Sequence, residues 1–397
     1  TTGASNTAVG QGALYANLGA SNNTATGKDA LNANTTGASN TATGFKSMFL
    51  NTTGLQNAAF GYEALYSNTS GNYNIALGIT ALGANTTGNN NVGIGKLALT
   101  NNTTASDNTA VGYRSLAANT TGAGATAVGR DSLYSNTTGT FNTAVGKYAL
   151  WANTTASSNT AVGYDSLQGN TTGANNTGFG RDALRVNTTG AQNVAVGFEA
   201  LKAHTTSNDC VAVGYQSQLA TTTGTNNTSL GMGSLRTITT QSGNTAIGTA
   251  SQYISAAANN TSVGFESLRY NTTGSVNTAV GKDSLKTNTT GTYNTAIGIG
   301  ALSANTTASA LVAVGEFALE ANTTGARNVA IGSSTMRVCT TANDSVAVGY
   351  QANRYNTSGS GNCSLGAYAL HGNTTGGDNV GIGYQALRVN TTGARNI

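Results

Sequence analysis

Residues 277–291 read Asn-Thr-Ala-Val-Gly-Lys-Asp-Ser-Leu-Lys-Thr-Asn-Thr-Thr-Gly, and variants of this stretch recur along the whole chain. The fifth residue of this stretch, Gly281, has an equivalent glycine in every copy. Successive equivalents are 17 residues apart, except for a single step of 16 from Gly248 to Gly264. Because the 23 glycines form one lattice, we interpret residues 1–397 as one continuous repeat region. The first members of this structural lattice are Gly10, Gly27, Gly44, Gly61 and Gly78.

The columns of the repeat alternate between bulky and small residues. Counted from the lattice glycine as position 0, position −1 is apolar in 21 of 23 units and position −2 is always Ala, Gly or Ser. Such alternation predicts a strand. We expect the bulky residues at −3 and −1 to fill a core and the small residues to face another backbone. The Leu at +4 suggests a second short strand, and Asn-Thr-Thr-Gly suggests a turn with left-handed residues.

These features together predict an all-β fold. Helical repeats are about 33 to 47 residues long, and Thr, Asn and Gly are poor helix formers. We therefore predict a parallel β-solenoid with 23 coils of 17 residues, stacked about 4.8 Å apart into an elongated rod. Proline is absent, which fits a backbone whose N–H groups are needed between coils. Stacked asparagines should form amide ladders.

Composition excludes several classes of protein. Only 8% of residues are charged and the formal net charge is +4, so nucleic-acid binding is not indicated. No apolar run approaches the roughly 18 residues of a membrane helix, so membrane insertion is not expected. Three cysteines cannot form a disulfide framework. The side chains available to each coil make a thin core, and we expect self-association, as a homotrimer, through the small-residue face.

Two irregularities stand out. Residues 197–214 resemble residues 332–349, which indicates that a block of about eight coils was duplicated. Within residues 204–260 the Asn at +7 is missing from four successive units, so we expect irregular coils there. Both chain ends are in phase with the repeat, and we interpret the sequence as a segment of a longer fibre.

Few residues suggest chemistry. We expect no catalytic, cofactor-binding or metal-binding residues. The glycines around Lys96 lack the spacing of a phosphate-binding loop, and the acidic residues are scattered. We expect His204 and His371 to be exposed, and the three cysteines, in three different columns, to be buried or unreactive thiols.

Two polar columns allow alternative functions. The Asn at +7 starts a glycosylation sequon, for example at Asn34, Asn51, Asn68, Asn119 and Asn136. Coils about 4.8 Å apart would crowd such glycans, so an amide ladder is the preferred interpretation. The Thr-Thr columns could also form a flat hydroxyl array that orders ice.

The run Asn-Thr-Ala-Val-Gly-[Tyr/Lys]-x-[Ala/Ser]-Leu-x-x-Asn-Thr-Thr-Gly, seen at 142–156 and 277–291, resembles repeats in tail-fibre proteins of marine bacteriophages. It is more distantly similar to the head repeats of trimeric autotransporter adhesins. The resemblance covers essentially the full chain and implies a trimeric fibre on a virion or cell surface. A binding tip outside this segment would contact a host-surface glycan or protein.

The sequence therefore predicts a non-enzymatic shaft of an extracellular adhesive fibre, in the first place a phage tail fibre. One alternative is a cellular filament or adhesin, with or without a glycan coat. An ice-binding solenoid is the other alternative.

Overall fold

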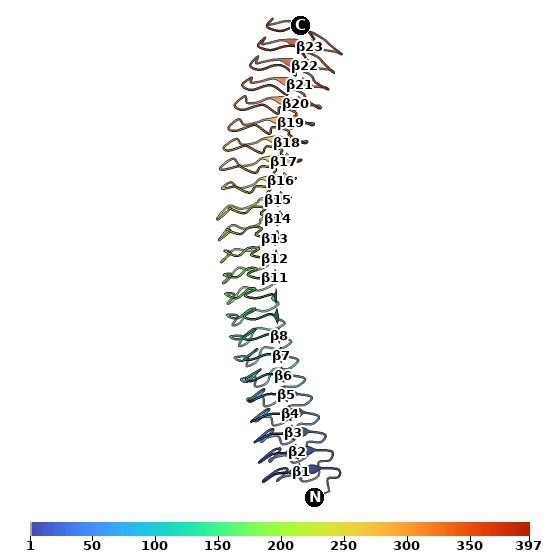
Figure 1. Cartoon of the computed structure of the whole chain (residues 1–397), viewed down its shortest axis with the longest axis vertical. Helices are drawn as coiled ribbons and strands as arrows, with labels where there is room; N and C mark the ends of the chain where they lie inside the picture. Colours follow the sequence, from blue (N-terminus) through green and yellow to red (C-terminus); the bar gives the residue numbers. More distant parts are fainter. Residues whose placement is uncertain (1) are drawn as a thin grey trace. The chain divides into compact units, whose positions relative to one another are not determined.

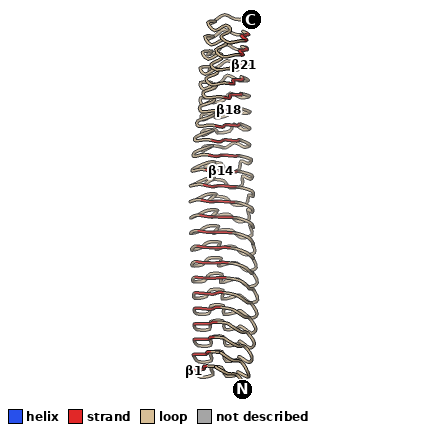
Figure 2. Tube along the Cα trace, turned by 90° about the vertical axis from the view of Figure 1, so that its right-hand side faces the viewer, coloured by secondary structure: helices blue, strands red, loops and turns tan. Residues whose placement is uncertain are grey.

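A computed structural model describes residues 2–397, which form two compact units, residues 2–199 and residues 200–397. Each unit is a stack of coils with one three-residue strand per coil, and no helix occurs in residues 2–397 (Figure 1). Within each unit, the strands lie along one side of the stack, and turns and loops make up the rest of each coil (Figure 2).

The strands follow the sequence repeat. The strands of the first unit are β1 (Thr7–Val9), β2 (Thr24–Thr26), β3 (Thr41–Thr43), β4 (Ala58–Phe60), β5 (Ile75–Leu77), β6 (Val92–Ile94), β7 (Thr109–Val111), β8 (Thr126–Val128), β9 (Thr143–Val145), β10 (Thr160–Val162), β11 (Thr177–Phe179) and β12 (Val194–Val196). Those of the second unit are β13 (Val211–Val213), β14 (Thr228–Leu230), β15 (Thr245–Ile247), β16 (Thr261–Val263), β17 (Thr278–Val280), β18 (Thr295–Ile297), β19 (Val312–Val314), β20 (Val329–Ile331), β21 (Val346–Val348), β22 (Cys363–Leu365) and β23 (Val380–Ile382).

Strands of successive coils pair in parallel and in register. Thr160 in β10 lies opposite Thr177 in β11, and Ala161 lies opposite Gly178, 17 residues on in each case. The prediction of an all-β parallel solenoid with a 17-residue coil is therefore confirmed.

The single 16-residue step leaves the strand register intact. Thr245 in β15 still lies opposite Thr261 in β16. The missing residue is absorbed in the turn, where the Asn244 amide reaches the Ala257 carbonyl 13 residues ahead instead of the usual 14. One turn is shorter, and the strands on both sides of it keep their alignment.

The predicted direction of the strand side chains is wrong. Position −2 is buried in every strand from β2 to β23, as at Ala59 and Ala144, and is exposed only in the terminal strand β1, whereas positions −3 and −1 are half-buried or exposed. The physical reason is the narrow interior. A Cβ added to Gly93, at −2, would lie 3.2 Å from Cγ of Leu82, which stands at +4 after the preceding lattice glycine, Gly78. Leu thus reaches across the coil, and only a small residue fits opposite it. The small-residue face is interior and cannot hold another chain.

The segment around the Leu at +4 is not a strand, which corrects the second strand prediction. Asp29 and Leu31 have φ values of 57° and 52°, in the left-handed region. Their N–H groups bond in opposite directions along the stack, Asp29 to the Gln11 carbonyl (2.8 Å) and Leu31 to the Ser47 carbonyl (2.9 Å). The Leu is nevertheless the buried anchor that the sequence indicated.

The Asn-Thr-Thr-Gly turn is also built differently from the prediction. Neither Asn34 nor Gly37 has a positive φ. Gly37 is small for another reason, because an added Cβ would lie 2.2 Å from the Gly54 carbonyl oxygen of the next coil. Close approach between coils, and not backbone handedness, explains this glycine.

Candidate functional site

Two asparagine ladders run along the interior of the stack, at positions −4 and +7. In the +7 ladder, Asn51 Nδ2 donates to Asn34 Oδ1 and to the Gly54 carbonyl, both at 2.9 Å. The −4 ladder reaches the same carbonyl, because Asn40 Nδ2 donates to it at 2.8 Å. Each turn carbonyl therefore joins both ladders, so these buried amides satisfy one another and fasten successive coils together.

All five sequon asparagines named above are fully buried members of the +7 ladder. The Nδ2 atom, which a glycan would modify, already donates two hydrogen bonds at Asn68 and Asn119. We therefore expect intact-protein mass spectrometry of the folded protein from a glycosylating host to show no glycan on these residues. Mass additions that map to these asparagines would contradict the expectation.

The two threonines of the turn have different environments. The first is half-buried, and its hydroxyl donates to the carbonyl of the equivalent threonine in the next coil, as from Thr52 to Thr69 at 2.9 Å. The second is exposed, as at Thr53 and Thr121. Only the second column is therefore a free hydroxyl row.

The two histidines differ, and the prediction that both are exposed is wrong for His204. His204 is fully buried at position +7, where its Nε2 lies 2.8 Å from the Ser207 carbonyl oxygen. Burial lowers the pKa of its imidazole below the usual 6.5. His371 is half-buried against Tyr355, with ring centroids 4.9 Å apart.

His204 should make stability depend on pH. Because its pKa is lowered in the folded state, the unfolded chain binds more protons below about pH 6.5, and the free energy of unfolding should fall as the pH drops from 7 to 5. His204→Asn is expected to reduce this slope in urea titrations at several pH values. His371→Asn removes a less buried imidazole and should keep most of the slope; equal slopes in wild type and His204→Asn would contradict the assignment.

The prediction of buried or unreactive thiols agrees with the structure for two of the three cysteines. Cys210 and Cys339 are buried, which raises the pKa of each thiol to about 11, whereas Cys363 is half-exposed on β22. We expect a chromogenic disulfide reagent at pH 8 to label about one thiol in dilute native protein and all three in denaturant. Rapid native labelling of all three would show that the coil interior opens.

Charged side chains pair on the surface of the coils. Asp131 is fully buried beneath Arg114 and Arg130, at 2.7 and 3.1 Å. Among residues 2–397, no group of three or more His, Cys, Asp or Glu side chains is arranged to hold a metal ion. The same residues contain no helix with the length and hydrophobicity needed to cross a bilayer.

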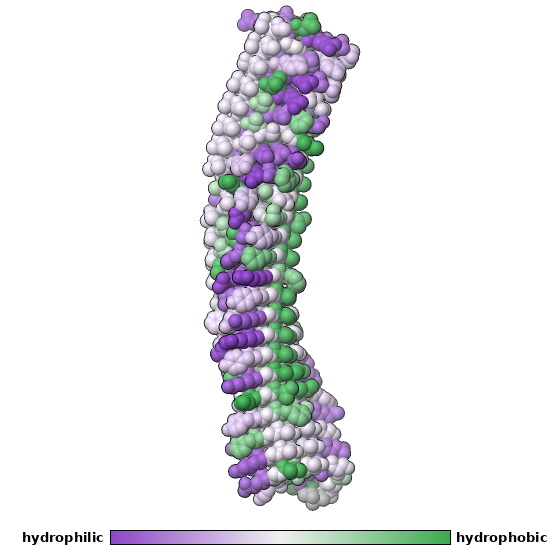
Figure 3. Space-filling view, viewed as in Figure 1, coloured by the Kyte–Doolittle hydropathy of each residue, from purple (hydrophilic) through white to green (hydrophobic). Residues whose placement is uncertain are grey.

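The outward side chains at −3 and −1 form what we call the strand face. Large apolar side chains are exposed on it, with Leu77 at 47% and Phe179 at 54% of their full accessibility. In Figure 3, hydrophobic residues gather in a narrow column over the strands of the first unit. The exposed apolar members are Val9, Phe60, Ile75, Leu77, Val145 and Phe179 in the first unit, and Val211, Leu230, Ile247, Ile297, Ile331, Val346, Leu365 and Ile382 in the second.

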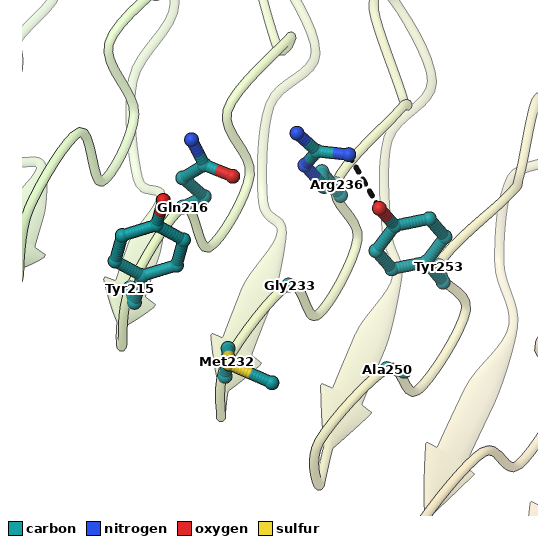
Figure 4. A pocket seen from close by; sticks show the side chains of 7 residues that line it. All are labelled: Tyr215, Gln216, Met232, Gly233, Arg236, Ala250 and Tyr253. Atoms are coloured by element: carbon teal, nitrogen blue, oxygen red, sulfur yellow. Dashed lines mark hydrogen bonds between the residues drawn. The ribbon is translucent and has the colours of Figure 1, made fainter.

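A small hollow of about 240 Å³ lies in the second unit, within residues 204–260 (Figure 4). The hollow exists because position +2 holds a small residue in two successive coils, Gly233 and Ala250. The next coil has the larger Glu266 at this position. Tyr253 closes one end and accepts a hydrogen bond from Arg236, whose guanidinium carbon lies 5.3 Å from the ring centroid. This hollow could contact only a small group.

The comparisons with known proteins add no relative. The sequence matches no protein-family model and no curated protein. The fold itself defines the class, a repeat protein built as a parallel β-solenoid with a 17-residue coil and asparagine ladders.

Proposed function

We propose that the chain is a structural shaft of an extracellular adhesive fibre, in the first place a phage tail fibre. The observation that supports this is the coil-to-coil hydrogen bonding, in which backbone, Asn and Thr side chains all bond along the stack axis. Such bonding resists bending and extension, which a spacer requires. The proposed shaft has no catalytic role and holds a binding tip, outside this segment, that contacts a host-surface glycan or protein.

Immunogold electron microscopy with an antibody against this chain tests the location. Decoration of tail fibres on virions, along the shaft and away from the tip, is the expected result. Decoration of cell-surface filaments in the absence of virions would overturn the phage assignment and favour the filament or adhesin. Labelling confined to the cell interior would overturn both.

The proposed oligomer is a homotrimer, with a mass three times the 39.6 kDa of one chain. The surface through which copies associate must differ from the one first expected, because the small residues at −2 are inside the coil. Sedimentation equilibrium measures the number of copies directly.

Ice binding has one specific observation in its favour. The second threonine of the turn is exposed in successive coils, as at Thr104 and Thr121, and gives a row of hydroxyl groups along most of each unit. Thermal hysteresis of the purified chain would favour ice binding over the shaft. The absence of thermal hysteresis would exclude ice binding.

A further inference from the structure

The fold does not explain why the strand face is apolar. Position −1 points outward, and Thr26 and Thr43 occupy it in β2 and β3 without disturbing the pairing of these strands. Threonine is also a good strand former. Apolar residues nevertheless occupy this column in 21 of 23 units. Their hydrophobicity is useful only if something else covers them.

The strand face has the composition of an interface centre. Positions −3 and −1 carry no charged residue in either unit, and their polar members are only Thr and the thiol of Cys363. Ion pairs such as those of Asp131 lie beyond it, at positions +1 and +2. Protein interfaces place charge at the rim and deplete it at the centre in the same way.

The area fits a stable complex. The first unit stacks 12 strands, so its strand face is about 50 Å long and about 10 Å wide, or roughly 500 Å². Two copies that pair this face of one unit would bury roughly 1,000 Å² in total, the area that a specific interface needs to reach. A patch of roughly 500 Å² is comparable to the largest apolar patch of a typical monomer, and such patches are often functional.

We propose that a second copy of this chain packs on the strand face. The apolar side chains repeat every ~4.8 Å, and a copy has the same repeat, so its ridges can enter the grooves between coils along the whole face. An added peptide strand fits poorly, because the coils on either side already bond the strand backbone, as Gly163 N bonds to the Val145 carbonyl at 2.8 Å. This inference deepens the proposed shaft, and rests on it, by naming the surface that joins its chains.

Lysines on the strand face test the proposal in the full chain. The variant Leu77→Lys, Val145→Lys and Phe179→Lys introduces three charges at exposed positions of β5, β9 and β11. The matched control places lysines ten residues further on in the same coils, at the exposed Thr87, Thr155 and Thr189. Sedimentation equilibrium should show an oligomer for wild type and control, and a dissociation constant at least about 100-fold higher for the strand-face variant.

A milder variant protects the test against misfolding. This variant carries Leu77→Thr, Val145→Thr and Phe179→Thr. Threonine already occupies the same position, −1, at Thr26 and Thr43, so the substitutions are compatible with the strand. The threonine variant should also dissociate. Circular dichroism must match wild type. A monomeric wild type, or a folded threonine variant that remains fully associated, overturns the inference. Neither result affects the immunogold test of the shaft.

Cys363 supplies a second measurement without mutation. It lies at position −3 on β22, within the strand face of the second unit. Its labelling rate should fall as the protein concentration rises through the association range. A rate that is independent of concentration while the mass increases would place the interface elsewhere and overturn the proposal.

Discussion

Gly146→Ala is expected to lower the free energy of unfolding of the first unit by about 3–5 kcal/mol. Gly146 is a lattice glycine with a φ of 134°, a region that alanine cannot adopt without strain. The added Cβ would also lie 2.5 Å from the Gly163 carbonyl oxygen and 2.7 Å from its carbon. These atoms belong to the backbone of the next coil, so no side-chain movement relieves the contact.

Gly83→Ala is the matched control. Gly83 is half-buried in the same unit, has no positive φ, and an added Cβ would lie 3.2 Å from the nearest atom, the Thr80 carbonyl oxygen. The same column holds Ala117 two coils on. Urea titrations followed by circular dichroism should therefore show a large shift for Gly146→Ala and a small one for Gly83→Ala. Similar shifts would mean that the lattice glycines have no special backbone role.

Asn102→Ala is expected to cost about 3–5 kcal/mol of stability, because three buried hydrogen bonds are lost. Asn102 Nδ2 donates to Asn85 Oδ1 at 2.9 Å and to the Ala105 carbonyl at 3.0 Å, and its Oδ1 accepts from Asn119 Nδ2 at 2.8 Å. Alanine leaves these three partner atoms buried without this partner, and the coil is too tightly packed to admit water freely.

The neighbouring residue provides the control. Asn101 is exposed, so Asn101→Ala should change stability by less than about 0.5 kcal/mol. The same urea titration compares the two variants. A small effect of both would show that the ladder contributes specificity of alignment and little stability.

The chain contains natural breaks in this ladder. Cys339 occupies position +7 in the coil after that of Asn322, where most coils have asparagine. Asn322 Oδ1 therefore has no hydrogen-bond partner. His204, Thr221, Ile238 and Ser255 replace the asparagine in four successive coils. An isolated replacement interrupts the ladder and leaves an asparagine next to it without its amide partner. When four neighbouring coils all lack the asparagine, only the coils at the two ends of the run have an asparagine beside a replaced position, so fewer amides are left unpaired for each replacement.

The sequence predicted the features that depend on stacking. A 17-residue period with invariant columns implies that identical residues meet in neighbouring coils, and the ladder of Asn34 and Asn51 is the direct result. The buried Leu at +4 follows from the same repeat.

Features that depend on the cross-section of the coil could not be predicted. Alternation at Thr143, Ala144 and Val145 defines two faces but not which one is inside. That is decided by the reach of the Leu side chain across the narrow interior, as the contact of Leu82 with position −2 shows. Likewise, no propensity suggests a left-handed φ at Leu31, where burial and hydrogen bonds between coils outweigh the intrinsic cost.

The shortened turn near Ala257 has a genetic consequence. A coil loses a residue here without shifting β15 against β16, and coils begin and end at equivalent points. Unequal recombination between the coding repeats would therefore add or remove whole coils. Each such event would change the length of the stack by about 4.8 Å per coil and leave the pairing between coils intact. If the chain serves as the proposed shaft, its reach could then change through the number of coils without new point mutations.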